Sequence, residues 1–488
     1  MPSESEQMEG MTNSGGHSPK SSLYIVGIGP GPAVLRTKAA CSAIRSAEYV
    51  VGYKPYLDLI SDLLPGKAVY SSGMGREVER VRAAVDLMDR GPVALVSSGD
   101  ANVYGMAGLG LEMAARPEEV QIVPGVTSFT AAACRAGLSF RECVAVISLS
   151  NLLTPWPEIE ARLRLAAETQ MPVALYNPRS RKRDWQLLRA LELLGSRDVL
   201  IAKNVGREAE EIFWSTTGRL VEEEALRERI DMNTLLILSG RGAFLGAASR
   251  QAGVNLVGIG PGHIEHLTLE AEMTLQSSQK VFGPARYLDL MEQAISSHRV
   301  VHSGPCPERM AARLAGAAAV ARDGGRASIL TGGDPSIFSS GWRVLEQAGQ
   351  VGQAGKAVPV HICPGVSAFS SVAARAGAPL INDFALLSSP LDPAGPARLA
   401  AAGYAVAVYN VKGEEIATLL QEVDSNRPVA LAQDVARRGE ETMVLTAGDM
   451  QMARPSGHRF TLLLASGRSR IREGRIITRR GYDSKYSY

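Results

Sequence analysis

The chain carries the same series of short motifs twice, and this internal repeat constrains its fold more than any other feature. A run of apolar and β-branched residues ending in glycines occupies residues 23–31, and nearly the same string returns at residues 255–262. Each string is typical of a buried strand stopped by a tight turn. Glycines allow such a turn to adopt positive φ and let another group approach the backbone. A threonine and a helical segment follow in both copies, from Thr37 and from Thr268.

Four further matches follow in the same order in both copies. They are Ser97–Ala101 with Thr331–Pro335, Val123–Phe129 with Cys363–Phe369, Ala174–Asn177 with Ala407–Asn410, and Thr234–Gly240 with Thr461–Gly467. A period this long indicates duplication of a whole domain and not a solenoid. We predict a disordered tail at residues 1–22, a first domain at 23–242, a linker at 243–253, and a second domain at 254–488.

Within each copy, β-branched runs alternate with helical segments, which predicts an α/β fold. The pattern restarts after Leu149, so we expect two subdomains per copy, divided near residue 150 and near residue 390. Ligands of α/β sheets gather at the carboxyl ends of the strands. The turns at residues 27–31, 98–101 and 124–127 each follow a predicted strand, and we expect them to line one cleft.

Composition excludes several functional classes. Lys and Arg number 52 against 50 Asp and Glu, so no net field draws the chain to nucleic acid or to a membrane surface. The five cysteines lack metal-site spacing and are typical of reduced core residues. The polar start has no apolar signal region, and no apolar run is long enough to span a bilayer. These features predict a cytoplasmic protein without a bound metal.

The glycine-rich turn does not match the dinucleotide fingerprint, because Gly31 comes one residue early and Pro32 takes the required place. This disfavours a nicotinamide dehydrogenase. Asp100 and Asp334 follow glycines at predicted strand ends. Each is either a turn aspartate that caps the following helix or a group facing a ligand, and its presence in both copies favours the second interpretation. The N–H groups at residues 124–128 could meet a ligand carboxylate.

A basic cluster, Arg179, Arg181, Lys182 and Arg183, follows Tyr176-Asn177-Pro178. Such a run is either a solvated helix start or a binding surface for a polycarboxylate, since arginine forks match carboxylates well. The second copy has Val411–Glu415 at this place and loses the cluster. The sequence offers no pattern that identifies a general base.

At these motifs the chain resembles the tetrapyrrole (corrin/porphyrin) methylases, and within them the precorrin-3B C17-methyltransferase branch. The strings that carry the resemblance are Val26–Gly31, Val51–Ile60, Ser97–Ala107, Val123–Ser128, Ser148–Trp156, Tyr176–Arg183, Asn204–Glu208 and Ile476–Tyr486. The resemblance implies tandem two-subdomain methylase domains, each with α/β sheets and a cofactor cleft between its subdomains. It also implies S-adenosylmethionine-dependent methylation of a precorrin or cobalt-precorrin at C17 with ring contraction, in cobalamin biosynthesis.

Site residues follow from the resemblance by position. The implied S-adenosylmethionine contacts are Pro30, Gly99, Asp100, Ala101, Val103, Thr127, Ser128, Tyr176 and Thr234. The implied tetrapyrrole border is the turn with Gly27, Gly29 and Gly31, and the acidic arms of the substrate would suit Arg179, Arg181 and Arg183. Methylation at another macrocycle position and tetrapyrrole binding without turnover are the alternatives.

The second copy departs from the branch. It has Thr331–Phe338 in place of the first copy's longer motif and Ser389–Pro393 in place of the Leu-Leu-Thr-Pro-Trp string, yet it keeps Asn382–Phe384, where the first copy has Phe140–Glu142. It is therefore a weak enzyme, a second methylation site, or a structural partner that imitates a homodimer within one chain. We favour the last, which makes the chain a pseudo-dimer, with an ordinary homodimer as the other arrangement.

Overall fold

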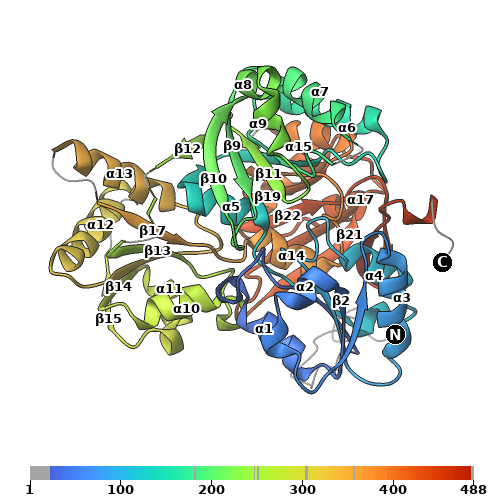
Figure 1. The fold of residues 1–488 in the computed structure, drawn as a ribbon, viewed down its shortest axis with the longest axis horizontal. Helices are drawn as coiled ribbons and strands as arrows, with labels where there is room; N and C mark the ends of the chain where they lie inside the picture. The colour runs from blue at the N-terminus through green and yellow to red at the C-terminus, as the bar shows by residue number, and fades with distance from the viewer. Residues whose placement is uncertain are drawn as a thin grey trace, which may run out of the picture.

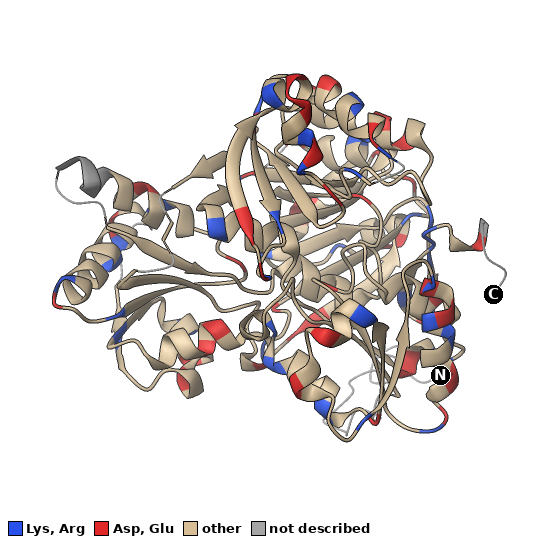
Figure 2. Ribbon diagram, viewed as in Figure 1, with Lys and Arg blue, Asp and Glu red and all other residues tan. Residues whose placement is uncertain are grey.

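A computed structural model describes residues 22–180, 183–246, 248–249, 252–302, 306–354, 358–390 and 392–484. Of the expected tail, only Ser22 lies within these ranges, and its amide and hydroxyl groups donate to Glu119. None of the helices in these ranges is long and apolar enough to cross a bilayer. Charged side chains of both signs are mixed over the helices and loops, while the strands are largely free of them (Figure 2).

Each half of the chain begins with a five-stranded parallel sheet, and the two sheets have the same strand order. In the first half the order is β3-β2-β4-β1-β5, and in the second it is β15-β14-β16-β13-β17. The strands of the first sheet are β1 (Leu23–Gly27), β2 (Tyr49–Tyr53), β3 (Ala68–Ser72), β4 (Val93–Ser97) and β5 (Val120–Val123). Those of the second are β13 (Val254–Gly258), β14 (Lys280–Gly283), β15 (His298–Val301), β16 (Ala327–Thr331) and β17 (Val360–Cys363). The predicted duplication with an α/β fold is confirmed.

The remaining long strands of both halves form one ten-stranded sheet with the order β10-β9-β11-β8-β7-β18-β19-β22-β20-β21. The first half supplies β7 (Cys143–Ser148), β8 (Val173–Tyr176), β9 (Asp198–Lys203), β10 (Glu211–Thr216) and β11 (Thr234–Leu238). The second half supplies β18 (Phe384–Ser388), β19 (Ala405–Val411), β20 (Pro428–Gln433), β21 (Glu441–Thr446) and β22 (Phe460–Leu464). This shared sheet lies in the middle of the molecule, and the two five-stranded sheets lie away from it at left and at lower right (Figure 1).

Helices connect the strands and cover the sheets. The first half contains α1 (Lys38–Ser46), α2 (Lys54–Asp58), α3 (Glu77–Leu87), α4 (Ala107–Met113), α5 (Ser128–Ala136), α6 (Trp156–Glu168), α7 (Trp185–Leu194), α8 (Thr217–Glu222) and α9 (Glu224–Glu228). The second half contains α10 (Leu269–Gln276), α11 (Ala285–Leu290), α12 (Cys306–Arg322), α13 (Gly341–Ala354), α14 (Ala368–Ala376), α15 (Gly395–Ala401), α16 (Gly413–Leu420) and α17 (Ala447–Ala453). Thr37 and Thr268 cap α1 and α10, where each side chain accepts an N–H of the first turn.

The two halves meet about an approximate twofold axis at the pairing of β7 with β18. These strands are antiparallel, and Ala145 lies directly opposite Ala385, its own counterpart in the repeat. The register therefore aligns Asn382–Phe384 with residues 142–144, not with Phe140–Glu142 as the sequence comparison suggested. A partner strand at β7 satisfies backbone groups that an edge strand would leave unpaired.

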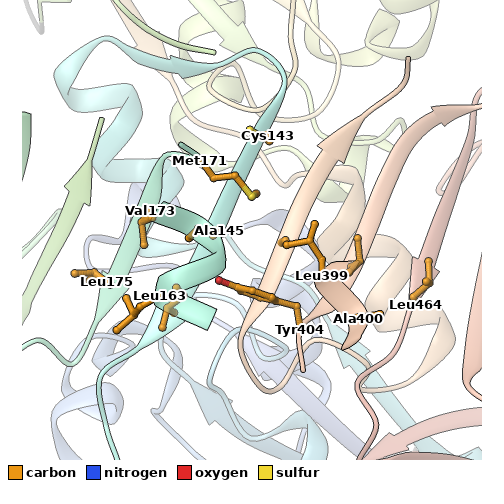
Figure 3. Close-up of a cluster of buried hydrophobic side chains, with 14 of the residues drawn as sticks. Cys143, Ala145, Leu163, Met171, Val173, Leu175, Leu399, Ala400, Tyr404 and Leu464 are labelled. Carbon is orange, nitrogen blue, oxygen red and sulfur yellow. The ribbon is translucent and has the colours of Figure 1, made fainter. Parts of the chain in front are cut away.

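Equivalent residues also touch elsewhere along this axis. Lys38 N donates to Leu267 O, and Leu269 N donates to Arg36 O, so the two helix starts pair across the halves. The core under the shared sheet is likewise continuous, with Leu163 and Leu175 of the first half near Leu399 and Tyr404 of the second (Figure 3). Burying this apolar surface between the halves makes them one packed body.

Two expected boundaries differ from the structure. β7 and β18 already belong to the shared sheet, so the subdomains divide before residues 143 and 384 and not near 150 and 390. The expected linker at 243–253 contains β12 (Ala243–Leu245), which pairs with β6 (Leu138–Phe140). The corresponding segment of the second half forms β23 (Ser469–Arg472) and β24 (Arg475–Thr478). β12 thus pairs with a strand far away in the sequence, whereas β23 and β24 pair with each other.

Candidate functional site

Three glycine turns of the first half meet at one edge of the five-stranded sheet. Gly29 N donates to Gly99 O at 3.1 Å, and Gly99 N donates to Gly29 O at 2.8 Å. A Cβ atom on Gly27 would lie 2.8 Å from Gly99 O, and one on Gly125 would lie 2.4 Å from the same oxygen. Any side chain at these two positions would push the backbones apart, so the contact requires glycine.

Asp100 joins two of these turns and is almost fully buried. Its Oδ1 accepts Asn102 N at 2.8 Å, and its Oδ2 accepts Gly125 N at 2.9 Å. Burial raises the pKa of this carboxyl group to about 7, and the two backbone N–H groups lower it in part. Asp334 accepts Ser336 N and Gly365 N in the same way. Both aspartates thus organise their turns through backbone N–H groups, and contact of either one with a ligand stays a prediction.

The start of α5 faces the same edge. Thr127 caps the helix through Thr130 N, and Phe129 N donates to the hydroxyl of Tyr176 at 3.1 Å. Of the first-turn N–H groups, this leaves the one of Ser128 without an acceptor among the described residues. Tyr176 ends β8 of the shared sheet, so its hydroxyl ties the two subdomains together across the cleft.

A space, called the hollow below, lies in front of Gly99, which is itself buried. This residue has φ +67°, and a Cβ atom built on it would meet nothing closer than 3.9 Å, where the nearest atoms are Ser128 Oγ and Val126 O. A ligand can therefore approach the Gly99 backbone directly. The side-chain amide of Asn102 is fully buried, and neither of its polar atoms finds a partner within the described ranges.

The predicted contacts Ala101, Val103 and Thr234 are all buried. The first two belong to the turn after β4. Thr234 starts β11, the strand that runs beside β8, and its Oγ1 donates to Asp231 Oδ1 at 3.2 Å. The turns and strand ends around Gly99 are thus brought together, and ligand contact by the individual residues remains a prediction.

Sequence reasoning missed the role of Arg207, although it singled out the string that contains it. Arg207 follows β9 of the shared sheet and reaches the opposite wall, where Nε donates to Pro30 O at 2.7 Å and Nη2 donates to Ser98 Oγ at 3.0 Å. Its second-half counterpart Arg437 repeats the first contact with Pro261 O at 2.7 Å. The arginine fixes the glycine-rich turn against the far subdomain.

The second half also contributes to the first cleft through Asp383, which holds Tyr104 in place. The Tyr104 hydroxyl donates to Asp383 Oδ1 at 2.8 Å, and its ring lies 5.1 Å from the ring of Tyr176. Asp383 also accepts Ser148 N at 2.9 Å and Arg162 Nη1 at 2.7 Å. Burial raises the pKa of Tyr104 well above its usual value, which keeps the hydroxyl a donor. The only sign in the sequence that Asp383 has a role was that Asn382–Phe384 is typical of the C17-methyltransferase branch.

The arginine cluster is partly engaged inside the protein. Arg179 pairs with Asp184 at 2.9 Å and donates to Arg227 O, and Arg183 donates to Asn177 O. The buried Nη1 of Arg183 has no partner in the part of the chain that the structure describes. Arg181 lies outside the described residues.

In the second half, the repeated positions line a cavity of about 220 Å³ between the two sheets. Its walls include the counterparts of the predicted cofactor contacts, namely Gly333, Asp334, Ile337, Ser367, Ala368, Tyr409 and Thr461. Tyr409 accepts Phe369 N at 2.8 Å, as Tyr176 accepts Phe129 N. The repeated motifs thus converge on one hollow in this half as well.

One group of metal-ligand side chains lies outside both clefts. His361 Nε2 is 3.0 Å from Glu270 Oε1, and Cys363 lies beside them. Arg135 Nη1 is 3.8 Å from the same glutamate oxygen, and burial raises the pKa of the Cys363 thiol. The carboxylate already faces a cation, and the thiol stays protonated. These features favour an ion-pair network between the halves.

A parallel sheet whose carboxyl-end turns face a second sheet across a glycine-lined hollow is the arrangement of a ligand-binding α/β protein. The sequence model described as Tetrapyrrole (Corrin/Porphyrin) Methylases matches residues 22–221 and 253–451. The chain belongs to this family, and it carries the family's domain twice.

Known relatives match about one half of this chain. A Salmonella typhimurium protein named probable cobalt-factor III C(17)-methyltransferase is 41% identical over 232 residues, which are 46% of this chain and 94% of that protein. The precorrin-3B C(17)-methyltransferase of a Sinorhizobium species is 38% identical over 44% of this chain and 87% of its own length. The crystal structure of the methyltransferase CobJ is 31% identical and covers 47% of this chain and 96% of that chain, with a TM-score of 0.39.

Proposed function

We propose that the first half of the chain transfers a methyl group from S-adenosylmethionine to C17 of a precorrin or cobalt-precorrin, with ring contraction, in cobalamin biosynthesis. Family membership and the names of the relatives support methyl transfer at C17. The observation that carries the proposal for this chain is the convergence of the three glycine turns and the start of α5 around the space in front of Gly99.

The residues around the hollow fit the methyl donor. An amino-acid carboxylate suits the free N–H of Ser128 at a helix start, where N–H groups and the helix dipole favour an anion. The bare backbone of Gly99 permits close approach of a flat group. The unpaired amide of Asn102 offers a donor and an acceptor, and leaving such a group without a ligand or water partner costs free energy.

When bound, S-adenosylmethionine supplies a methyl group already activated by its sulfonium. The protein therefore acts mainly by positioning. Asp100 and the paired glycines fix the floor of the cleft, Tyr176 and Arg207 join its two walls, and Tyr104 is held in place from the second half.

The acidic macrocycle would lie between the turn at residues 27–31 and the arginine cluster. Arg183 keeps a buried, unpartnered Nη1, and so retains hydrogen-bonding capacity for a carboxylate among the described groups. Arg179 would keep its internal pair with Asp184 and act through its charge. On this proposal the second half serves the first as the subunit partner does in a dimer.

Methyl transfer by the purified full-length chain tests the proposal. The chain is incubated with methyl-labelled S-adenosylmethionine and either a precorrin or its cobalt form, and label in the macrocycle and S-adenosylhomocysteine are both measured. Gly99→Val points two methyl groups into the hollow and should abolish transfer. Gly439→Val is the matched control, because this glycine also has positive φ and open space but lies outside the clefts. Absence of label from both macrocycles, or equal activity of the two variants, would refute the proposal.

A further inference from the structure

The last string of the resemblance, which begins at Ile476, ends the second half of the chain but lies against the first half. β24 packs beside α4 of the first half. Ile477 and Tyr482 are buried among the core residues of the first five-stranded sheet. Arg475 Nη1 donates to Val120 O at 2.6 Å, at the start of β5. The end of the second half is therefore anchored to the first half along several residues.

Arg480 carries this contact to the first cleft. Its Nη1 donates to the main-chain oxygen of Tyr104 at 3.0 Å, and its Cζ lies 5.5 Å from the centroid of the Tyr104 ring. A guanidinium over an aromatic ring is attracted by the electron-rich face of the ring. The nearby carboxylates Glu112 and Asp483 pair with Arg479, and within the described ranges no carboxylate pairs with Arg480. Its charge therefore stays available to the tyrosine.

Tyr104 needs such support because its backbone has an uncommon conformation. Its φ is +53°, in the left-handed region that a tyrosine adopts only where the surroundings hold it. Tyr104 belongs to the turn between β4 and α4, residues 98–106, which also carries Gly99 and Asn102. We propose that Arg480 is a positioning residue of the first cleft, which holds this turn in place from the second half through Tyr104. The inference rests on the proposed function, since the turn is the one that would hold the methyl donor.

The second half holds its equivalent turn by a different kind of contact. Phe338 has φ +48°, and its main-chain N–H donates to Phe140 O at 2.9 Å. A main-chain bond to the first half thus supports the second turn. In the first half, the side chains of Asp383 and Arg480 contact Tyr104 instead. Each of these side chains can be replaced singly, so the support of the first turn can be tested without altering the main chain.

The neighbours of Arg480 fix its place. Gly481 has φ +90°, and a Cβ atom on it would lie 3.0 Å from Leu153 O, so the chain turns directly against the loop after β7. On the other side, Arg479 Nε lies 3.4 Å from Glu112 Oε1. An arginine whose main chain is held on both sides loses less freedom on making its contact. Three separate strings of the resemblance thus meet at this arginine.

Hydrogen exchange and steady-state kinetics of the full-length chain test the inference. Arg480→Met removes the donor and the charge, so amide exchange in residues 98–106 should become about five- to twentyfold faster, while residues 332–340 should exchange at the same rate as before. The KM for the methyl donor should rise about three- to tenfold. Loss of folded protein would lower the apparent kcat alone, so a change in KM reports on the cleft. Arg480→Lys keeps the charge and a donor and should restore most of both effects.

Two further variants show whether the effect passes through Tyr104. Glycine accepts positive φ and has no ring, so in a Tyr104→Gly chain the substitution Arg480→Met should change KM by less than about twofold. Arg470→Met removes an exposed arginine from the same hairpin, on β23, and should change neither exchange nor KM.

Unchanged exchange and KM in Arg480→Met, or effects that add in full to those of Tyr104→Gly, would overturn the inference. The exchange measurement needs no substrate. A chain that transfers no methyl group to either macrocycle would therefore contradict the proposed function, and exchange in residues 98–106 would still decide whether Arg480 holds the turn.

Discussion

Replacement of Asp383 by asparagine tests how strongly the second half supports the first cleft. The Asp383 carboxylate is 4% exposed, and it receives three hydrogen bonds, from Tyr104, Ser148 and Arg162. An asparagine has one acceptor oxygen and one NH₂ group. In either orientation its NH₂ faces a donor, so one side of the network is broken and Arg162 loses its buried counter-charge.

The expected cost follows from burial and from the partner that remains. Removing one member of a buried ion pair destabilises a protein by about 3–5 kcal/mol. Arg162 keeps a second partner, Glu158, at 3.3 Å, although that carboxylate is 39% exposed and more strongly screened. We therefore expect Asp383→Asn to lower the free energy of unfolding by about 2–4 kcal/mol.

Urea unfolding followed by circular dichroism measures this difference, and Asp392→Asn is its matched control. Asp392 pairs with Arg398 at 2.6 Å, but both side chains are more than half exposed. An exposed pair contributes about 0–1 kcal/mol, so the control should unfold almost as the unmodified chain does. Equal effects of the two substitutions would refute the claim that Asp383 is a buried link between the halves.

The Tyr104 branch of this network has its own readout. Tyr104→Phe removes one hydroxyl and copies Phe338, the residue at this position in the second half. In a double-mutant cycle with Asp383→Asn we expect a coupling energy of about 1 kcal/mol. If Tyr104 orients ligands in the first cleft, Tyr104→Phe should lower kcat for methyl transfer at little cost in stability. Additive stabilities and an unchanged kcat would contradict this role.

Three further predictions concern the first cleft. Because the pKa of Asp100 rises from 3.8 to about 7 on folding, the folded chain retains a proton between these values that the unfolded chain has lost, so the free energy of unfolding should fall as the pH rises through this range. A urea-unfolding series at several pH values should be flatter for Asp100→Asn, and an equally steep series would contradict the assignment. Arg207→Lys removes the guanidinium group that donates to both Pro30 and Ser98, so it should raise KM for the methyl donor about three- to tenfold in steady-state kinetics. The exposed Arg219→Lys should leave KM unchanged. Equal KM values for the two variants would contradict a role of Arg207 in shaping the cleft. Gly125→Ala should destabilise the chain by about 1–3 kcal/mol and weaken S-adenosylhomocysteine binding in calorimetry. Gly349→Ala, in an open helical position, should stabilise the chain by about 0.5–1 kcal/mol. A Gly125→Ala chain more stable than the Gly349→Ala chain would be inconsistent with the packed turns.

The sequence by itself determined the duplication, the α/β class, and the meeting of the glycine turns at one sheet edge. These features are local: a β-branched run followed by glycines defines a strand and its turn, and parallel neighbours bring such turns together. The turns at Gly29, Gly99 and Gly125 are brought together in this way. The motif resemblance likewise rests on contiguous strings.

Only the tertiary structure decided which strands and side chains from distant parts of the chain become partners. The pairing of β7 with β18 moved both subdomain boundaries, and the bond between Tyr104 and Asp383 joins residues 279 positions apart. Arg207 and Arg437 acquire their partners in the same way, from the opposite wall of a cleft. Such contacts depend on how two complete sheets pack against each other. The periodicity and spacing of the residues near each contact do not predict this packing.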